Sequence, residues 1–257
     1  MRTMDGLFKK IDTVRVPVRD IERSADWYKK QLGMQILEKN TNRAELKVYG
    51  GETMMVLERV DSFSPMDYLD RRGLVTHFNF NTLDAELAHM MLKDKGIQVT
   101  DIWDEDFLKY FAFRDLDGNV LSVCYEKEHS MFYQPITKPE ISLFERVEAV
   151  FILVRDLPKM LAWYRRLPGL KLLKNWTQGA DLSVGNGETI ITLIQMDDFT
   201  PGQNLYFEFA TAEMEKTHAF LKQMGTRVSE IKHEQLLASD PEGNQFGVRV
   251  SASHVKV

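Results

Sequence analysis

Val18-Arg19-Asp20 and the Trp27-Tyr28 pair that follows form the stretch that decides the fold, because both return later in the chain. They reappear as Val154-Arg155-Asp156 and Trp163-Tyr164, each 136 positions further on. Self-similarity at a constant offset indicates a duplicated structural unit. The sequence therefore predicts two copies of one domain.

A turn motif supports the duplication. Asp115-Leu-Asp-Gly-Asn119 returns 125 positions later as Asp240-Pro-Glu-Gly-Asn244. The offset becomes shorter along the copy, as expected when loops differ in length while the elements are kept. A residue present in both copies is expected to be structural, and one that differs marks what a single copy does.

Composition limits the class of protein. With 257 residues, two domains of about 120 residues are expected. Hydrophobic residues at 44% and charged residues at 28% are typical of a soluble globular chain. The net charge of −5 argues against a general nucleic-acid binder, which needs a basic face. The single cysteine, Cys124, excludes a disulfide framework and a cysteine zinc site. Without a signal-like N-terminus or an 18-residue apolar span, we expect a cytoplasmic protein that does not enter a membrane.

The first half of each copy is predicted to form a strand, a helix and three further strands. Alternating valines indicate a strand over 13–18, and Asp20 is a candidate N-cap for a helix over 21–32. Gly33 is expected to end this helix. The three short strands that follow are predicted over 35–38, 44–49 and 53–59.

The same order is predicted again within the copy. It comprises a strand over 76–80, a helix over 83–95 and strands over 97–103, 107–114 and 120–125. Gly118, in the turn before the last strand, is expected to have positive φ. Each copy thus holds two βαβββ modules, and the predicted fold class is α+β. The expected domains are residues 9–127 and 145–251, joined by a linker over 128–144.

Paired βαβββ modules with these motifs resemble the vicinal oxygen chelate superfamily. That superfamily includes glyoxalase I, bleomycin-resistance proteins and extradiol dioxygenases. The resemblance covers nearly the whole chain outside the linker and the termini. It implies that paired modules curl into half-open barrels around a cavity, so that four modules make two such domains. It says little about the reaction, because related folds host many activities.

The resemblance also implies positions for metal ligands. In the first copy these are Thr13, Glu58, His77 and Ser122, and in the second they are Ala149, Ile194, Tyr206 and Gly247. A catalytic divalent metal normally takes three or four ligands from histidines and carboxylates. Only Glu58 and His77 qualify, so we expect neither a catalytic metal nor another cofactor. The alternative is one divalent transition metal in the first domain, held by Glu58 and His77.

Glu58 and His77 also have explanations that need no metal. Alternation places Thr13 and Arg15 on the cavity face of the first strand. The strand that bears Glu58 is expected beside it in the family, so Arg15 and Glu58 are predicted to form an ion pair. His77 is expected to be a hydrogen-bonded cavity residue. His77 and Glu58 are also the candidates for acid–base catalysis.

The expected ligand-binding side chains point into the two cavities. In the second copy, Glu208 and Arg249 are a candidate ion pair on neighbouring strands. The first cavity suits a polar molecule, and the second suits an apolar or aromatic one or is a filled core. The expected ligand-binding residues are Thr13, Arg15, Glu58, His77, Asn79, Ser122, Tyr206, Glu208 and Arg249.

Five aromatic side chains precede the Asp115 turn. They are Trp103, Phe107, Tyr110, Phe111 and Phe113. They either line a pocket for a flat ligand or form the core of a sheet.

Four functions remain open on these grounds. The preferred one is a small-molecule-binding protein without a catalytic metal. The alternatives are a metal-dependent lyase or dioxygenase of the same superfamily, a metal-free acid–base catalyst, and a structural partner with closed cavities. The expected partner is a small organic molecule, and the chain is expected to be a monomer or a homodimer.

Overall fold

The computed structural model describes residues 6–250 except 71, 134, 136–141, 198 and 200–205. The chain divides into two compact units. The central unit is Arg15–Ala149, and the terminal unit combines the chain up to Val14 with the chain from Val150 onward. The domain boundaries expected from the sequence stay a prediction, and part of the expected linker lies outside the described residues.

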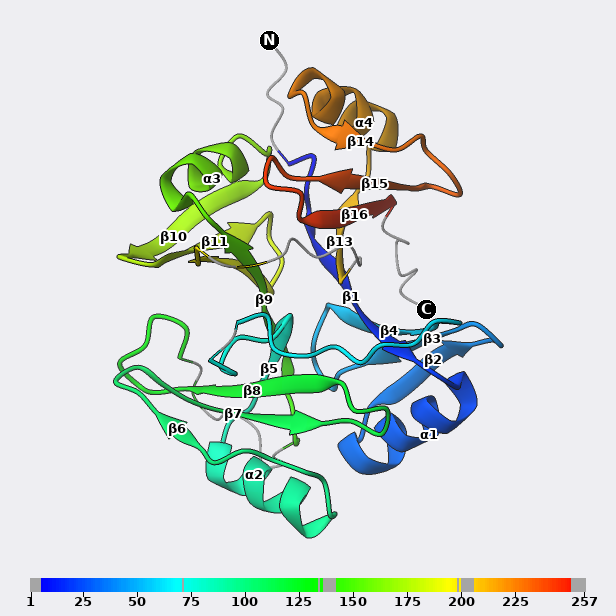
Figure 1. The fold of residues 1–257 in the computed structure, drawn as a ribbon, viewed down its shortest axis with the longest axis vertical. Coiled ribbons are helices and arrows are strands. Elements are labelled where there is room, and N and C mark those ends of the chain that lie inside the picture. Colours follow the sequence, from blue (N-terminus) through cyan, green and yellow to red (C-terminus); the bar gives the residue numbers. More distant parts are fainter. Residues whose placement is uncertain are drawn as a thin grey trace. The chain divides into compact units, whose positions relative to one another are not determined.

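Four βαβββ modules follow one another along the chain, which confirms the predicted α+β class (Figure 1). The first comprises β1 (Lys10–Val18), α1 (Ile21–Leu32), β2 (Gln35–Lys39), β3 (Arg43–Lys47) and β4 (Met54–Arg59). The second comprises β5 (Phe78–Asn81), α2 (Ala85–Asp94), β6 (Trp103–Asp104), β7 (Leu108–Arg114) and β8 (Val120–Glu126).

The second copy repeats this order. Its first module comprises β9 (Arg146–Val154), α3 (Leu157–Tyr164), β10 (Leu170–Trp176), β11 (Gly179–Val184) and β12 (Ile190–Gln195). Its second comprises β13 (Phe207–Thr211), α4 (Met214–Gln223), β14 (Arg227–Val228), β15 (Gln235–Ser239) and β16 (Gln245–Val250). No helix in the described part of the chain is long and apolar enough to cross a membrane.

Capping side chains fix where the helices begin. The Asp20 carboxylate accepts a hydrogen bond from the Arg23 backbone N–H at 2.8 Å, and Gly33 ends α1 with a φ of 73°. Both confirm the predicted limits of this helix. The next helix begins at Ala85, later than predicted, because Asp84 is its N-cap and accepts from the Leu87 backbone N–H at 2.8 Å.

The strand predicted over 97–103 is mostly not a regular strand. Only Trp103–Asp104 forms β6, and a single bridge joins Val99 to Phe113. Between them the Thr100 hydroxyl accepts from the Ala112 backbone N–H at 3.0 Å. A side chain that binds a backbone donor replaces a bond of the regular ladder, which accounts for the interruption.

The strands of the described residues form two eight-stranded sheets. Their orders are β14-β15-β16-β13-β1-β4-β3-β2 and β10-β11-β12-β9-β5-β8-β7-β6. Strands of the first and fourth modules therefore share one sheet, and strands of the second and third share the other. β1 pairs antiparallel with β13, with Lys10 opposite Ala210 and an irregularity between Ile11 and Thr13. Across the described residues neither sheet closes on itself.

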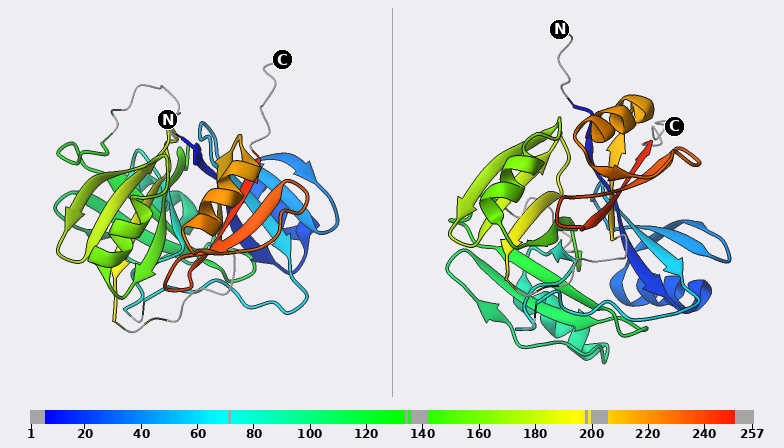
Figure 2. Two further views of the ribbon diagram at one scale, coloured as in Figure 1. Left: turned by 90° about the horizontal axis from the view of Figure 1, so that it is seen from above. Right: turned by 45° about the horizontal axis from the view of Figure 1, so that its top comes forward.

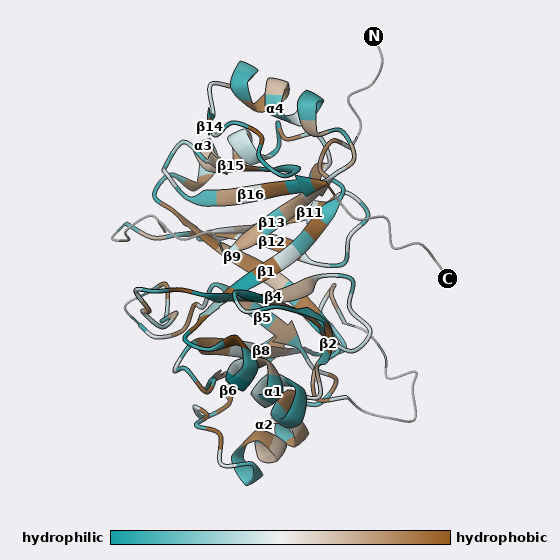
Figure 3. Ribbon diagram, turned by 90° about the vertical axis from the view of Figure 1, so that its right-hand side faces the viewer, coloured by the Kyte–Doolittle hydropathy of each residue, from teal (hydrophilic) through white to brown (hydrophobic). Residues whose placement is uncertain are grey.

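Each helix packs on strands of its own module (Figure 2). In the central unit, α1 lies on β2, β3 and β4, and α2 lies on β7 and β8. In the terminal unit, α3 lies on β11 and β12, and α4 lies on β14, β15 and β16. Figure 3 shows α1 as largely hydrophilic and β9 as largely hydrophobic, as expected for a surface helix and a buried strand.

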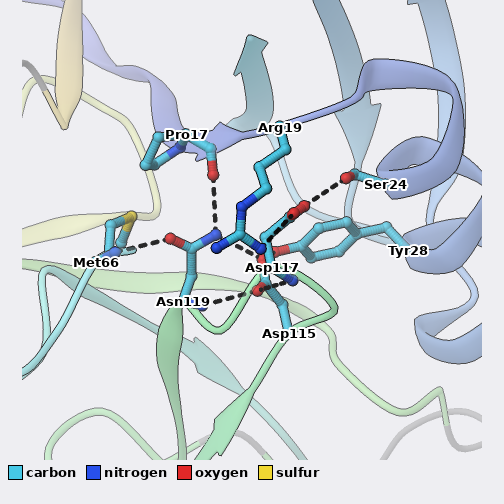
Figure 4. A network of polar contacts seen from close by, with 8 residues as sticks. All are labelled: Pro17, Arg19, Ser24, Tyr28, Met66, Asp115, Asp117 and Asn119. Carbon is cyan, nitrogen blue, oxygen red and sulfur yellow. Dashed lines mark hydrogen bonds and ion pairs between the residues drawn. The ribbon is translucent and has the colours of Figure 1, made fainter. Parts of the chain in front are cut away.

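The repeated turn motif ties three segments of the central unit together (Figure 4). Asp115 accepts from the backbone N–H groups of Asp117 and Asn119, and Gly118 has a φ of 91° as predicted. The Asn119 amide donates to the Pro17 carbonyl at 2.9 Å, and its oxygen accepts from the Met66 N–H at 2.7 Å. The motif that marks the duplication is therefore a structural clamp.

The helix tyrosine that recurs in both copies belongs to the same clamp. The Tyr28 hydroxyl donates to the Asp115 carboxylate at 2.7 Å, and Tyr164 donates to Asp240 at 3.0 Å in the second copy. Burial, followed by the adjacent carboxylate, raises the pKa of Tyr28 well above its ordinary value. Its hydroxyl therefore remains a donor at neutral pH.

Removing this hydroxyl should weaken the central unit. We expect Tyr28→Phe to lower the free energy of unfolding by about 1.5 kcal/mol, because a buried carboxylate loses a donor. Urea denaturation followed by circular dichroism measures the change. Tyr125→Phe, at a half-buried tyrosine of the same unit, should cost less than about 0.5 kcal/mol. Equal costs for the two variants would show that the Asp115 bond contributes nothing specific.

Candidate functional site

A row of charged side chains crosses three adjacent strands of the central unit. Arg15 on β1 donates a hydrogen bond to Glu58 on β4, which confirms the predicted ion pair. Arg43 on β3 lies directly opposite Glu58 and forms an ion pair with Glu45 at 2.5 Å. Glu58 thus lies between two arginines. The Arg15 side chain is only 12% exposed, so a guanidinium is largely withdrawn from water here.

Arg43 and Glu45 were absent from the residues expected at the site. Residues two apart on a strand share one face, so Arg43 and Glu45 belong to the same side of β3. The register of β3 against β4 then places Arg43 beside Glu58. The opposite charges at Arg43 and Glu45, two positions apart at the start of a predicted strand, are the feature of the sequence that could have indicated this part of the site.

A second polar cluster lies in the terminal unit. The Thr13 hydroxyl donates to the Glu208 carboxylate at 2.8 Å, and both side chains are buried. Glu208 lies opposite Gly247 in the parallel pairing of β13 and β16. A Cβ at Gly247 would lie 2.6 Å from the Glu208 Cγ. Glycine at this implied ligand position therefore leaves the space that Glu208 occupies.

Asp12 forms ion pairs with two basic residues of this second cluster. Its buried carboxylate forms ion pairs with Arg249 at 3.3 Å and with Lys10 at 3.7 Å. Asp12 was not among the expected site residues. β13 and β16 are neighbours as expected, and the Glu208–Arg249 ion pair itself stays a prediction. Tyr206 immediately precedes β13 and is half-buried.

The remaining expected residues lie on the other sheet, also within the central unit. The Asn79 amide oxygen accepts from the Ala149 backbone N–H at 2.9 Å, which joins β5 to β9. The Ser122 and Thr76 hydroxyls share a hydrogen bond of 2.6 Å. His77 directly precedes β5, and desolvation lowers its pKa to about 3. The imidazole is therefore neutral at physiological pH and a weaker base than an exposed histidine.

The donor set does not fit a catalytic metal. Glu58 lies on β4 of one sheet, and His77 precedes β5 of the other. Ser122 and Thr13, at two further implied positions, are engaged in hydrogen bonds to Thr76 and Glu208. Within the described ranges, no group of three or more His, Cys, Asp or Glu side chains is arranged to hold a metal ion.

The aromatic cluster divides between two roles. Phe111 and Phe113 are buried, and Phe113 stacks with Phe80 and Phe144, so these two belong to the core. Trp103 is 48% exposed and stacks with Tyr110 at 6.2 Å. Cys124 is buried, and burial raises its pKa well above the ordinary value, which removes it as a nucleophile.

Two family models match the chain. The model described as the Glyoxalase/Bleomycin resistance protein/Dioxygenase superfamily matches residues 10–123. The model described as a Glyoxalase-like domain matches residues 149–249. The chain therefore belongs to the glyoxalase/bleomycin resistance/dioxygenase superfamily, with a match in each copy.

Solved structures agree on the fold. A putative dioxygenase from Bacillus subtilis subsp. subtilis str. 168 is 12% identical, with a TM-score of 0.70 over 95% of this chain and 86% of that one. Glyoxalase I from Zea mays is 17% identical, with a TM-score of 0.70 over 94% and 92%. A point mutant of the maize enzyme is 18% identical, with a TM-score of 0.70 over 94% and 93%. At these identities the likeness shows the fold alone. A comparison with curated proteins found no significant match.

Proposed function

We propose that the chain binds a small organic molecule through the charged row of the central unit, without a catalytic metal. The observation that carries this proposal is the position of Glu58 between Arg15 and Arg43. Withdrawing a guanidinium from water is costly, and replacing such an ion pair by apolar residues is often neutral or stabilising. A charged row of this kind is consistent with recognition of a polar group on a ligand.

The chemistry of the row indicates what the ligand presents. A guanidinium offers a planar fork of donors that suits carboxylate, phosphate or carbonyl oxygens. Glu58 and Glu45 form ion pairs with the arginines and can also accept hydrogen bonds from hydroxyl or amide groups. We therefore expect a polar molecule with adjacent acceptor and donor groups.

Ligand-induced stabilisation tests the proposal. A ligand at ten times its Kd should raise the free energy of unfolding by about 1.4 kcal/mol if it binds only the native state. Thermal unfolding of the purified chain against a library of metabolites and antibiotics measures this as a rise in Tm. Arg15→Met should abolish the rise for any ligand found. Arg72→Met, at an exposed arginine paired with Asp70 in the same unit, should leave it unchanged.

Two outcomes would contradict the proposal. One is a library in which no compound raises the Tm of the native chain. The other is a ligand whose effect survives both Arg15→Met and Glu58→Gln. The metal-dependent alternative predicts stoichiometric transition metal in untagged protein purified without chelators, with uptake lost in His77→Ala. Such a result would favour a lyase or dioxygenase over simple binding.

A further inference from the structure

β6 ends the order of its sheet and presents a strand edge to solvent. Backbone bonds hold the segment around it along β7, since Arg114 N–H donates to the Gln98 carbonyl and Glu105 N–H to the Leu108 carbonyl. Within the part of the chain that the structure describes, no strand pairs with its outer side. Side chains already bind some carbonyls of this segment, such as those of Thr100 and Asp106. The other outward N–H and C=O groups of such an edge are offered to another extended chain.

The exposed charges along this edge have one sign. The segment 98–107 carries Asp101, Asp104, Glu105 and Asp106 and no lysine or arginine. All four are exposed. Lys109 and Lys127 form ion pairs with Asp104, at 3.7 and 2.5 Å. No ion pair engages the other three carboxylates among the described residues, so the edge carries negative charge.

Exposed aromatic side chains accompany these carboxylates. Trp103 is 48% exposed and Phe107 is 47% exposed. Tyr110 stacks on Trp103 with an interplanar angle of 13°, which supports the indole in a defined orientation. An exposed indole face attracts a lysine or arginine side chain through a cation–π interaction. The edge therefore combines backbone, aromatic and acidic groups within a few residues.

We propose that this acidic edge, residues 98–107, binds an extended lysine- or arginine-rich segment of another protein as an added strand beside β6. Main-chain hydrogen bonds give such strand addition its affinity, and alternate side chains give its specificity. One face of the added strand places a cation over Trp103. Carboxylates such as Asp101 and Glu105 select basic segments and repel a second copy of the same edge.

A second copy of this chain is the competing occupant. β10 ends the same sheet order at its other end and carries Lys171 and Lys174. Pairing of β6 with β10 of a neighbour is heterologous, and such contacts produce open assemblies unless the rotation closes a ring. A basic segment of another protein supplies the same lysine or arginine side chains and forms a one-to-one complex that does not continue into an open assembly. We therefore favour it.

Fluorescence anisotropy with defined peptides tests the proposal. The probe is a fluorescein-labelled, C-terminally amidated octapeptide of alternating lysine and valine, at low salt. The comparison peptides replace lysine with glutamate, or valine with glycine to keep the charge without strand propensity. We expect only the lysine–valine peptide to bind. Trp103→Ala should weaken it at least tenfold, and Trp176→Ala, at an exposed tryptophan on β10, should change it less than twofold.

A second variant protects the test against misfolding at Trp103. Asp101→Asn combined with Glu105→Gln removes two charges whose side chains make no hydrogen bond within the described structure, and should weaken binding at least fivefold. Equal binding of the lysine–glycine peptide would overturn the proposal, as would binding that both variants leave within twofold. Sedimentation of the chain alone should show no Trp103-dependent self-association. If it does, the edge belongs to a second copy.

Discussion

Gly185→Ala is expected to lower the free energy of unfolding by about 3 to 4 kcal/mol, or to prevent folding altogether. Gly185 has a φ of 54°, in the left-handed region that disfavours a side chain. A Cβ there would overlap the backbone carbonyl of Lys9. The added Cβ is fixed by the backbone of residue 185, and the atoms that it meets belong to the backbone of Lys9. A change of side-chain rotamer therefore cannot relieve the clash.

Gly225→Ala is the matched control for this substitution. Gly225 also has positive φ, at 72°, but nothing lies within 4 Å of a Cβ added there. Alanine at this position should cost about 1 kcal/mol, the conformational part alone. Urea denaturation of both variants separates the close approach from backbone strain. Similar losses for the two variants would refute the close approach at Lys9.

The Gly185 contact shows how the N-terminal segment is held in the terminal unit. Phe8 N–H donates to the Pro168 carbonyl and Lys9 N–H to the Ala210 carbonyl, both at 2.9 Å. Asn186 N–H donates to the Lys9 carbonyl at 3.2 Å. The segment thus bonds to two turns of the third module and to β13. Glycine at position 185 lets the turn approach this closely.

Local signals predicted the elements that short-range interactions determine. The limits of α1 follow from Asp20 and Gly33, whose caps act within a single turn of the helix. Gly118 has the positive φ expected for the Asp115–Asn119 turn. The Arg15–Glu58 pair was predictable once the family's strand order placed β1 beside β4.

Contacts between strands that are far apart in the chain could not be predicted from the sequence. Glu208 accepts a hydrogen bond from Thr13, 195 residues away in the chain, and Arg249 pairs with Asp12, which is even further away in the chain. An irregularity between Ile11 and Thr13 alters which side chains share a face. A prediction that places every second residue on the same face as Thr13 therefore leaves Asp12 on the opposite face. The Lys9 backbone also approaches Gly185, and nothing in the sequence around either residue indicates this contact.

His77 should make the folded chain sensitive to acid. Its pKa is about 3 in the folded protein, compared with 6.5 for an ordinary histidine, because burial disfavours the imidazolium. Between these values the unfolded chain binds a proton that the folded chain does not. The stability that depends on a neutral His77 is therefore complete above pH 6.5 and is lost as the pH falls toward 3.

The loss can be measured against a variant that does not titrate. From pH 7.5 to 4.5 this histidine should remove up to about 2.7 kcal/mol from the free energy of unfolding, since one pKa unit corresponds to about 1.4 kcal/mol. His77→Gln should show a decline smaller by that amount, whatever its stability at neutral pH. His129→Gln, at an exposed histidine of the same unit, should follow the native chain. Burial raises the pKa values of Asp115 and Asp240, but these groups are the same in all three proteins and cancel. Parallel pH profiles for the native chain and His77→Gln would show that the imidazole is not desolvated and would restore His77 as a candidate base near neutral pH.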